Sequence, residues 1–262
     1  MTSTLPPATA CHSQAPYPLA RRWMGALAVS TLVLAGCATH PQAHPQDPFE
    51  SYNRSMSQFN DALDEAVLKP VATGYQQAVP ALARTGVSNF FANLGDAWSF
   101  VNNTLQLRGE GAMSSLFRFG INTFLGFGGV LDIASEMRLE RHKQDFGMTL
   151  GRWGVPTGPY VVLPLLGPST VRDTLALPID RQGSLLNGVD DVATRNSLYA
   201  LRLVDTRANF LRAGEVLDSA ALEKYTFTRD VFLRVRNQRA GINNGPTTGG
   251  ASDGSLPPEP EQ

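Results

Sequence analysis

The sequence is poor in the residues from which disulfide and metal sites are built. It has two cysteines and four histidines in 262 residues. Two cysteines exclude a disulfide scaffold or a cysteine-based zinc cluster, and four histidines leave little material for metal chemistry. We therefore expect no metal site and no cofactor. The formal net charge of -1 also excludes a protein that binds nucleic acid mainly by charge.

Charged side chains are scarce as well. Lys, Arg, Asp and Glu make up 17% of the residues, against about 25% in an ordinary soluble domain. The hydrophobic fraction of 42% is ample for a core, and the length allows one or two domains. The shortage of charge indicates that much of the surface does not face bulk water.

The N-terminus predicts a lipoprotein signal peptide over residues 1–36. The pair Arg21-Arg22 precedes the apolar run Trp23–Leu34, which is too short to span a bilayer as a helix. The run ends in Leu34-Ala35-Gly36-Cys37, which resembles a bacterial lipobox, so Cys37 is the predicted lipidation site. The alternative is an ordinary secretory signal with a chance cysteine. In bacterial lipoproteins, an aspartate directly after the lipidated cysteine resembles an inner-membrane retention signal. This chain has Ala38 at that position, which favours export to the outer membrane.

Composition divides the remaining chain into three parts. Residues 37–46 carry two prolines and no Lys, Arg, Asp or Glu, so we expect a lipidated N-terminus and an extended tether. Residues 47–240 are expected to form one helical domain. Residues 241–262 are rich in Gly, Pro, Ser, Thr and acidic residues and are expected to be disordered.

Apolar periodicity predicts an all-α domain of amphipathic helices. Asp47-Pro48 is typical of a helix N-terminus. Apolar residues then recur every three or four positions, at Phe49, Tyr52, Met56, Phe59, Leu63 and Val67. Pro70 is predicted to end or kink this helix. A further helix is expected from Pro80, and Asp96 is interpreted as the N-cap of another; no alternating strand pattern is found.

Two uncharged stretches stand out. The first lies between Arg118 and Asp132 and includes Gly126-Phe127-Gly128-Gly129. It lacks the third glycine and the preceding strand of a dinucleotide-binding loop, so a tight apolar helical hairpin fits better. The second, between Arg152 and Arg172, has the length of a membrane span but contains four prolines and three glycines. It cannot cross a bilayer as a lipid-exposed helix, and must be covered by protein, lie at the interface or line a cavity.

Short motifs spread over residues 47–239 occur in the order typical of one known family. The most specific block begins with Asp145-Phe146-Gly147 and continues through Gly167-Pro168-Ser169. The positions that carry the similarity are Asp47, Pro48, Asn53, Arg54, Asn60, Asp145, Gly147, Gly151, Trp153, Gly158, Pro159, Tyr160, Pro164, Gly167, Pro168, Arg172 and Asp173. In these motifs the chain resembles the MlaA (VacJ) lipoproteins.

The resemblance implies an all-helical, ring-shaped domain embedded in the inner leaflet of the outer membrane. It also implies an amphipathic channel and association with a trimeric porin. The implied function is removal of phospholipid misplaced in the outer leaflet and its transfer to the periplasmic carrier MlaC, which maintains lipid asymmetry. No enzymatic activity and no cofactor are implied.

With a channel implied, the glycine-rich turn is a candidate for the part that sets or gates its opening. The candidate residues are Asn122, Phe124, Gly126, Phe127, Gly128, Gly129 and Asp132. The alternative is a helix–turn–helix whose glycines only permit tight packing. The helix around Leu198–Phe210 is the candidate porin-facing surface.

Two other functional classes stay open at this stage. The first is a structural lipoprotein that only supports porin assembly or envelope integrity. The second is a lipase, which needs an activated nucleophile and a base. The sequence has no Gly-x-Ser-x-Gly motif, and His142 is the only histidine outside the signal and the tether, so a Ser-His-Asp triad is disfavoured.

Overall fold

The computed structural model describes residues 44–220 and 223–240, and the folded unit begins at Pro45. The predicted signal peptide 1–36, Cys37, most of the predicted tether and the tail 241–262 lie outside the described residues. The elements in chain order are α2 (Glu50–Leu63), the π-helix η1 (Asp64–Leu68), α3 (Lys69–Ala78), α4 (Ala81–Leu105), α5 (Gly109–Phe124), α6 (Ile133–Glu136), α7 (Phe146–Arg152), β1 (Tyr160–Leu163), β2 (Gly167–Thr170), α8 (Val171–Gly183), the 3-10 helix η2 (Leu185–Gly188), α9 (Val192–Asn209), α10 (Leu211–Ala220) and α11 (Lys224–Ala240).

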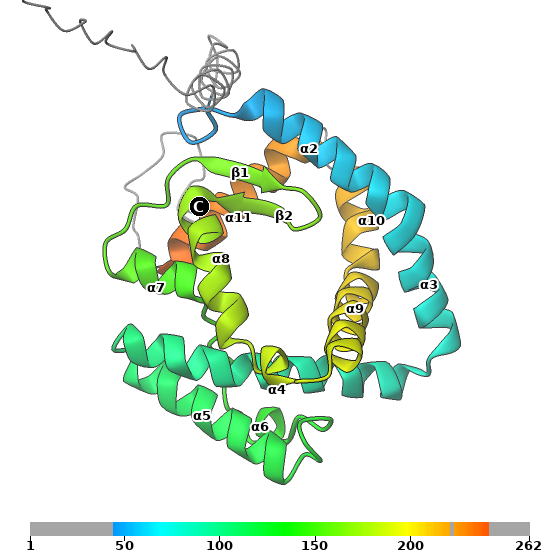
Figure 1. The fold of residues 1–262 in the computed structure, drawn as a ribbon, viewed down its shortest axis with the longest axis vertical. Coiled ribbons are helices and arrows are strands. Elements are labelled where there is room, and N and C mark those ends of the chain that lie inside the picture. Colours follow the sequence, from blue (N-terminus) through cyan, green and yellow to red (C-terminus); the bar gives the residue numbers. More distant parts are fainter. Residues whose placement is uncertain (1–43, 221–222, 241–262) are drawn as a thin grey trace, which may run out of the picture. The chain divides into compact units, whose positions relative to one another are not determined.

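Within this unit the helices follow one another around a ring (Figure 1). One arc consists of α2, η1 and α3, a second consists of α4, and α9, α8 and the two strands complete the circuit. The arcs touch, because α3 and α4 both pack against α9, α7 packs against α8, and α2 packs against β1. Helices α5 and α6 lie outside α4. The predicted ring of helices is confirmed.

The first arc is one long helix that changes its hydrogen bonding just before Pro70. The apolar stripe predicted a helix from Phe49 to Val67, and the structure has α2 followed directly by η1. Proline cannot donate a backbone hydrogen bond, and its ring clashes with the carbonyl four residues earlier. In the π turn the N–H of Lys69 donates to the carbonyl of Asp64. Pro70 therefore alters the helix locally, and the arc continues as α3.

Helix α4 runs without interruption from Ala81 to Leu105, so the interpretation of Asp96 as a helix N-cap is wrong. Asp96 lies within the helix, is buried, and forms an ion pair with Arg118 of α5 at 3.3 Å. A buried acid whose partner is distant in the chain gives the same local pattern as a capping acid, which explains the error.

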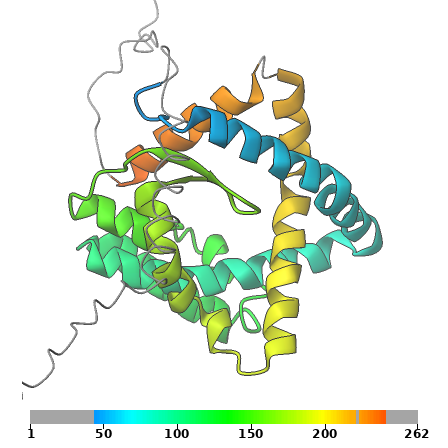
Figure 2. The same ribbon diagram turned by 45° about the horizontal axis from the view of Figure 1, so that its top comes forward.

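The proline-rich segment between Arg152 and Arg172 contains the two β-strands that the structure shows among the described residues. Strand β1 pairs antiparallel with β2, with Tyr160 opposite Thr170 and Leu163 opposite Gly167. Leu165, in the turn between them, has a φ of 65°, and Gly167, at the start of β2, has a φ of 77°. In both views its tip points toward the middle of the ring (Figure 1, Figure 2). No strands were predicted here, because the strands have four residues each and their sequences do not alternate between apolar and polar residues.

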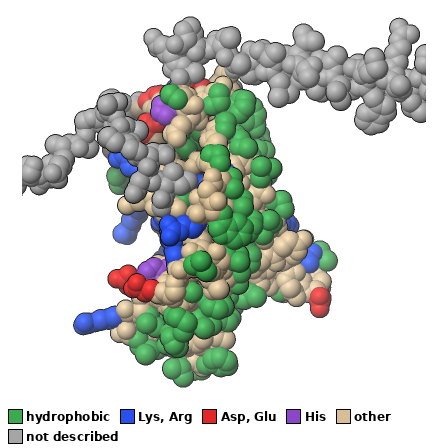
Figure 3. All heavy atoms as spheres, turned by 90° about the vertical axis from the view of Figure 1, so that its left-hand side faces the viewer, with side chains coloured by type: hydrophobic (Ala, Val, Ile, Leu, Met, Phe, Trp, Pro, Cys, Tyr) green, Lys and Arg blue, Asp and Glu red, His purple; other side chains and the backbone are tan. Residues whose placement is uncertain are grey.

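Many of the side chains buried within the wall of the ring are polar, whereas many large apolar side chains are exposed on its surface. Its largest fully buried side chains include Arg118, Asn53 and Asn102 as well as Tyr160. Large apolar side chains are left outside, and those at least 70% exposed are Leu82, Leu107, Phe124, Phe127, Leu166 and Leu175. Figure 3 shows hydrophobic side chains gathered in a band from top to bottom, with most of the charged side chains beside it. Among the described residues, no helix has both the length and the apolar character needed to cross a membrane.

Candidate functional site

The turn between α5 and α6 needs its glycines for structural reasons. A Cβ atom at Gly126 would lie 2.3 Å from the carbonyl oxygen of Leu131 and 2.5 Å from that of Asn122. Gly128 and Gly129 have φ values of 72° and 96°, in the region that favours glycine. These requirements explain why glycine stands at all three positions.

Asn122 and Asp132 hold this turn in place through a buried polar network. Asn122 donates to Asp132 Oδ1 at 2.9 Å and accepts from the N–H of Ala134 at 2.9 Å. Arg118 Nη2 lies 2.8 and 2.9 Å from the two oxygens of Asp132, and Ser135 Oγ donates to it at 2.7 Å. Burial alone would raise the pKa of Asp132, but hydrogen bonds from Ser135 and Asn122 and the charge of Arg118 lower it to about 2. Both side chains therefore serve the fold of the turn.

Phe124 and Phe127 are the candidate residues whose side chains are left outside. They are 86% and 81% exposed, and Phe127 has a φ of 52°, which a non-glycine residue rarely adopts. Together with α5 and α6, the turn lies outside α4 (Figure 1, Figure 2). The turn that carries these exposed aromatic residues therefore lies on the far side of α4 from the middle of the ring.

The first residues of the unit fasten α2 to the C-terminal helix. Asp47 is fully buried and accepts hydrogen bonds from Asn53 Nδ2 at 2.7 Å and from the hydroxyl of Tyr225. Arg229 Nη1 forms an ion pair with the same carboxylate at 3.2 Å. Burial, the hydrogen bond to Asp47 and its charge raise the pKa of Tyr225, so the hydroxyl stays a donor. The motif residues Asp47 and Asn53 therefore join α2 to α11.

Two asparagines, two helical turns apart on α2, pair with the free edge of β1. The side chain of Asn53 bonds two backbone groups of β1, at 3.0 and 2.8 Å. The side chain of Asn60 donates to the carbonyl of Leu163 at 2.9 Å and accepts from the N–H of Leu165 at 2.8 Å. Edge strands leave backbone groups unpaired, and these amides supply the missing partners. The hairpin is therefore held against the first arc of the ring.

A second cluster of charges joins α7, α8 and α11. Arg236 contacts Asp145 at 2.5 and 3.0 Å and Asp173 at 2.8 Å, and Arg172 contacts Asp173 at 3.0 Å. Burial would raise the pKa of Asp173, but Arg236 and Arg172 together lower it. A Cβ atom at Gly147 would lie 2.5 Å from Asp173 Oδ1. Glycine at this position lets the acid and its arginines approach α7.

The remaining motif positions also have structural roles. A Cβ atom at Gly151 would lie 2.6 Å from Arg172 Nη1, and Trp153 Nε1 donates to the carbonyl of Leu105 at 3.0 Å. Arg54 pairs with Glu50 at 2.7 Å. The others lie before α2, in the loop before β1, or in the hairpin: Pro48, Gly158, Pro159, Pro164, Gly167 and Pro168.

An apolar pocket of about 590 Å³ lies between the first half of α4, α9 and residues 130–131. Its apolar lining includes Leu82, Val87, Phe90, Val130, Leu131, Leu198 and Leu201. Asn89, a polar lining residue, donates to the carbonyl of Val130 at 3.1 Å, so its amide is already bonded. Part of the helix predicted to face a porin therefore lines this pocket.

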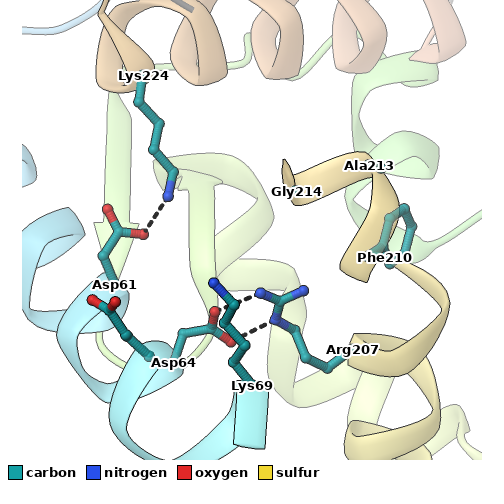
Figure 4. A pocket seen from close by; sticks show the side chains of 9 residues that line it. Asp61, Asp64, Lys69, Arg207, Phe210, Ala213, Gly214 and Lys224 are labelled. Carbon is teal, nitrogen blue, oxygen red and sulfur yellow. Dashed lines mark hydrogen bonds and ion pairs between the residues drawn. The ribbon is translucent and has the colours of Figure 1, made fainter. Parts of the chain in front are cut away.

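A second pocket, which we call the charged pocket, has a volume of about 400 Å³. It is lined by Asp61, Asp64, Glu65, Lys69, Arg207, Phe210, Ala213, Gly214 and Lys224 (Figure 4). Arg207 Nε and Nη2 contact the two oxygens of Asp64 at 2.6 and 2.7 Å, and Lys224 Nζ lies 3.2 Å from Asp61 Oδ1. The acids come from the first arc, whereas Arg207 and Lys224 come from α9 and α11.

Neither pocket was predicted from the sequence. The acids of the charged pocket share one helix face at positions i, i+3 and i+4, but Arg207 is 143 residues from Asp64. In the part of the chain that the structure describes, no group of three or more His, Cys, Asp or Glu side chains is arranged to hold a metal ion.

Comparisons with known proteins agree with this architecture. The model of the MlaA lipoprotein family matches residues 45–239. The intermembrane phospholipid transport system lipoprotein MlaA of Escherichia coli is 35% identical over 225 residues, which cover 80% of this chain and 86% of the relative. The protein of that name from Haemophilus influenzae is 31% identical over 230 residues, 83% of this chain and 89% of the relative.

Other relatives match over less of their length. The uncharacterized protein RT0044 of Rickettsia typhi is 41% identical over 127 residues, 48% of this chain, and the match spans about half of the relative, 51%. A solved structure reported under "Structural basis for maintenance of bacterial outer membrane lipid asymmetry" is 34% identical with a TM-score of 0.66. The match covers 74% of this chain and 98% of that one.

Proposed function

Because this chain belongs to the MlaA lipoprotein family, we propose that it is the outer-membrane lipoprotein of a phospholipid transport system. In this proposal it removes phospholipid misplaced in the outer leaflet through an amphipathic channel within the ring. It passes the lipid to a periplasmic carrier of the MlaC type and so maintains lipid asymmetry.

The observation that carries the proposal is a ring of family-typical sequence whose polar groups are buried and whose large apolar side chains are exposed. Phospholipid has the same dual chemistry, with a charged headgroup and apolar tails. The apolar pocket and the charged pocket offer one environment for each. A wall held together by buried ion pairs and asparagines can keep its shape while its outer surface contacts lipid.

We propose that the ring is seated in the inner leaflet of the outer membrane. The hydrophobic band in Figure 3 and the exposed Phe124 and Phe127 support this, because burying such a side chain in hydrocarbon is worth about 1.5–3 kcal/mol. Acylation of Cys37 would add an anchor of several chains. A trimeric porin is the proposed membrane partner, and Leu203, which is 49% exposed on α9, is a candidate contact.

Transport of this kind needs no covalent chemistry, and we propose that the protein is not an enzyme. The earlier lipase alternative predicts release of fatty acid from phospholipid by the purified protein. The transport proposal predicts intact phospholipid and no release.

The experiment compares cells with and without this chain. We expect the cells that lack it to accumulate phospholipid in the outer leaflet, measured as phospholipid accessible to added phospholipase on intact cells, with porin trimers at normal levels. The structural alternative predicts the reverse, with lost or misassembled porin trimers as the primary defect. Normal lipid asymmetry in the deletion cells would overturn the proposal.

A further inference from the structure

We propose that the charged pocket binds the headgroup of a zwitterionic phospholipid, with its ammonium group on the acids and its phosphate on the bases. This inference rests on the proposed function and extends it to headgroup selection. A pocket of this kind favours an ethanolamine headgroup over a glycerol headgroup, which carries a net negative charge.

The balance of charge points to a neutral, dipolar ligand. Among the described residues that line this space are three acids, Asp61, Asp64 and Glu65, and three bases, Lys69, Arg207 and Lys224. A site with equal numbers of both signs gives a net anion no overall attraction, but it can pair both ends of a zwitterion. The side chains of Asp61, Arg207 and Lys224 reach into this space from three sides (Figure 4).

Part of this charge is available to a ligand. Within the described residues, the side chains of Glu65 and Lys69 make no hydrogen bond or ion pair, and both are exposed. The Lys224–Asp61 pair is 44% and 48% exposed, and exposed pairs contribute only about 0–1 kcal/mol. The bidentate Arg207–Asp64 pair is shorter and holds α9 against η1.

The backbone brings these groups together. Glu65 lies in the π-helix η1, and η1 ends directly before Lys69 and Pro70. A π turn is rare and occurs frequently at functional sites. Asp61, Glu65 and Lys69 are spaced four residues apart, which places them near one face of the helix, and all three line the pocket.

Size and apolar surface fit the same ligand. A volume of about 400 Å³ corresponds to roughly a dozen water molecules, which is ample for a phosphoethanolamine group. Phe210 is 60% exposed and lines the pocket with Ala213. These side chains offer apolar surface where the glycerol backbone and the first acyl carbons would follow the headgroup.

The test measures transfer of labelled phosphatidylethanolamine or phosphatidylglycerol from vesicles that contain the lipidated full chain to a purified carrier of the MlaC type. We expect the wild type to transfer phosphatidylethanolamine about tenfold faster, the effect of about one charged hydrogen bond. Glu65→Gln and Lys69→Gln should each reduce this ratio severalfold. The controls Glu136→Gln and Lys143→Gln remove the same charges outside the pocket and should keep the wild-type ratio.

The outcomes separate the two levels of the proposal. Equal transfer of both lipids by the wild type, or a ratio unchanged in Glu65→Gln and Lys69→Gln, would overturn headgroup selection while phospholipid transport stands. Failure to transfer either lipid would contradict the transport function as well. Faster transfer of phosphatidylglycerol would show that the pocket acts as an anion site, which also contradicts the inference.

Discussion

Asp132→Asn tests whether the candidate turn residues act through the fold. Asparagine keeps the size of the side chain but removes the charge opposite Arg118, whose side chain is 1% exposed. The carboxylate of Asp132 itself is 19% exposed and receives hydrogen bonds from Arg118, Asn122 and Ser135. The positive charge of the buried Arg118 would then be only partly paired with negative charge, and a buried charge that is not fully paired destabilises the folded state.

The magnitude follows from the pKa of Asp132. Burial opposes ionisation, but hydrogen bonds from Ser135 and Asn122 and the charge of Arg118 lower this pKa from 3.8 to about 2. The difference of about two units corresponds to at most about 2.7 kcal/mol. We expect about 2 kcal/mol, because the carboxylate is 19% exposed and solvent screens part of the interaction. Because the folded-state pKa is lowered, this stabilisation is present above about pH 4 and is lost as the pH falls toward 2.

The assay is unfolding of wild type and Asp132→Asn in detergent between pH 7 and pH 2. We expect the free energy of unfolding of the variant to be about 2 kcal/mol lower at pH 7, and the difference to shrink between pH 4 and pH 2. The raised pKa of Asp96, caused by burial, acts in the opposite sense, but it is common to both proteins and cancels in the difference to first order.

Asp191→Asn is the matched control. Asp191 caps α9 at the surface, where asparagine caps about as well as aspartate, so this variant should unfold like the wild type. Equal stability of Asp132→Asn and wild type at pH 7, or a deficit that is the same at pH 7 and pH 2, would refute the reasoning.

Three further predictions concern single residues. Gly126→Ala should lower stability by a few kcal/mol, because its Cβ would clash with backbone oxygens. Gly120→Ala, whose Cβ would have no atom within 4 Å, should be neutral or stabilise α5 by about 1 kcal/mol. Thermal unfolding of the two variants distinguishes these effects. Asn60→Ala should lower stability by about 1–3 kcal/mol and speed amide hydrogen exchange at Leu165, and unchanged exchange there would contradict the contact. Cys37→Ser should leave an uncleaved or mislocalised precursor, and a mature wild-type chain without acyl groups in intact-mass analysis would refute lipidation.

The helical part of the fold could be predicted because its signals are local. The apolar stripe from Phe49 to Val67 predicted the helix that the structure shows as α2 and η1. Pro70 was expected to end or kink the helix, and its missing donor instead produced the π turn. The β-hairpin was missed, because its strands are short and their outer edge is satisfied by side chains of α2 that lie far away in the chain.

The charged pocket and the buried ion pairs could not be predicted, because they depend on residues that are far apart in the chain. Asp96 and Arg118 are 22 residues apart, and Asp64 and Arg207 are 143 apart. No periodicity reports such pairs. The glycine-rich turn was correctly identified as a place of close backbone approach, but its position outside α4 follows from the packing of α5 against α4.

The most direct test of the account is transfer of phospholipid to a soluble carrier. Vesicles containing labelled phospholipid and the lipidated full chain would be incubated with a purified MlaC-type carrier, and the label bound to the carrier would be measured. The account predicts that the label reaches the carrier much faster with the chain than with vesicles alone. Equal loading of the carrier in the presence and absence of the chain would contradict it.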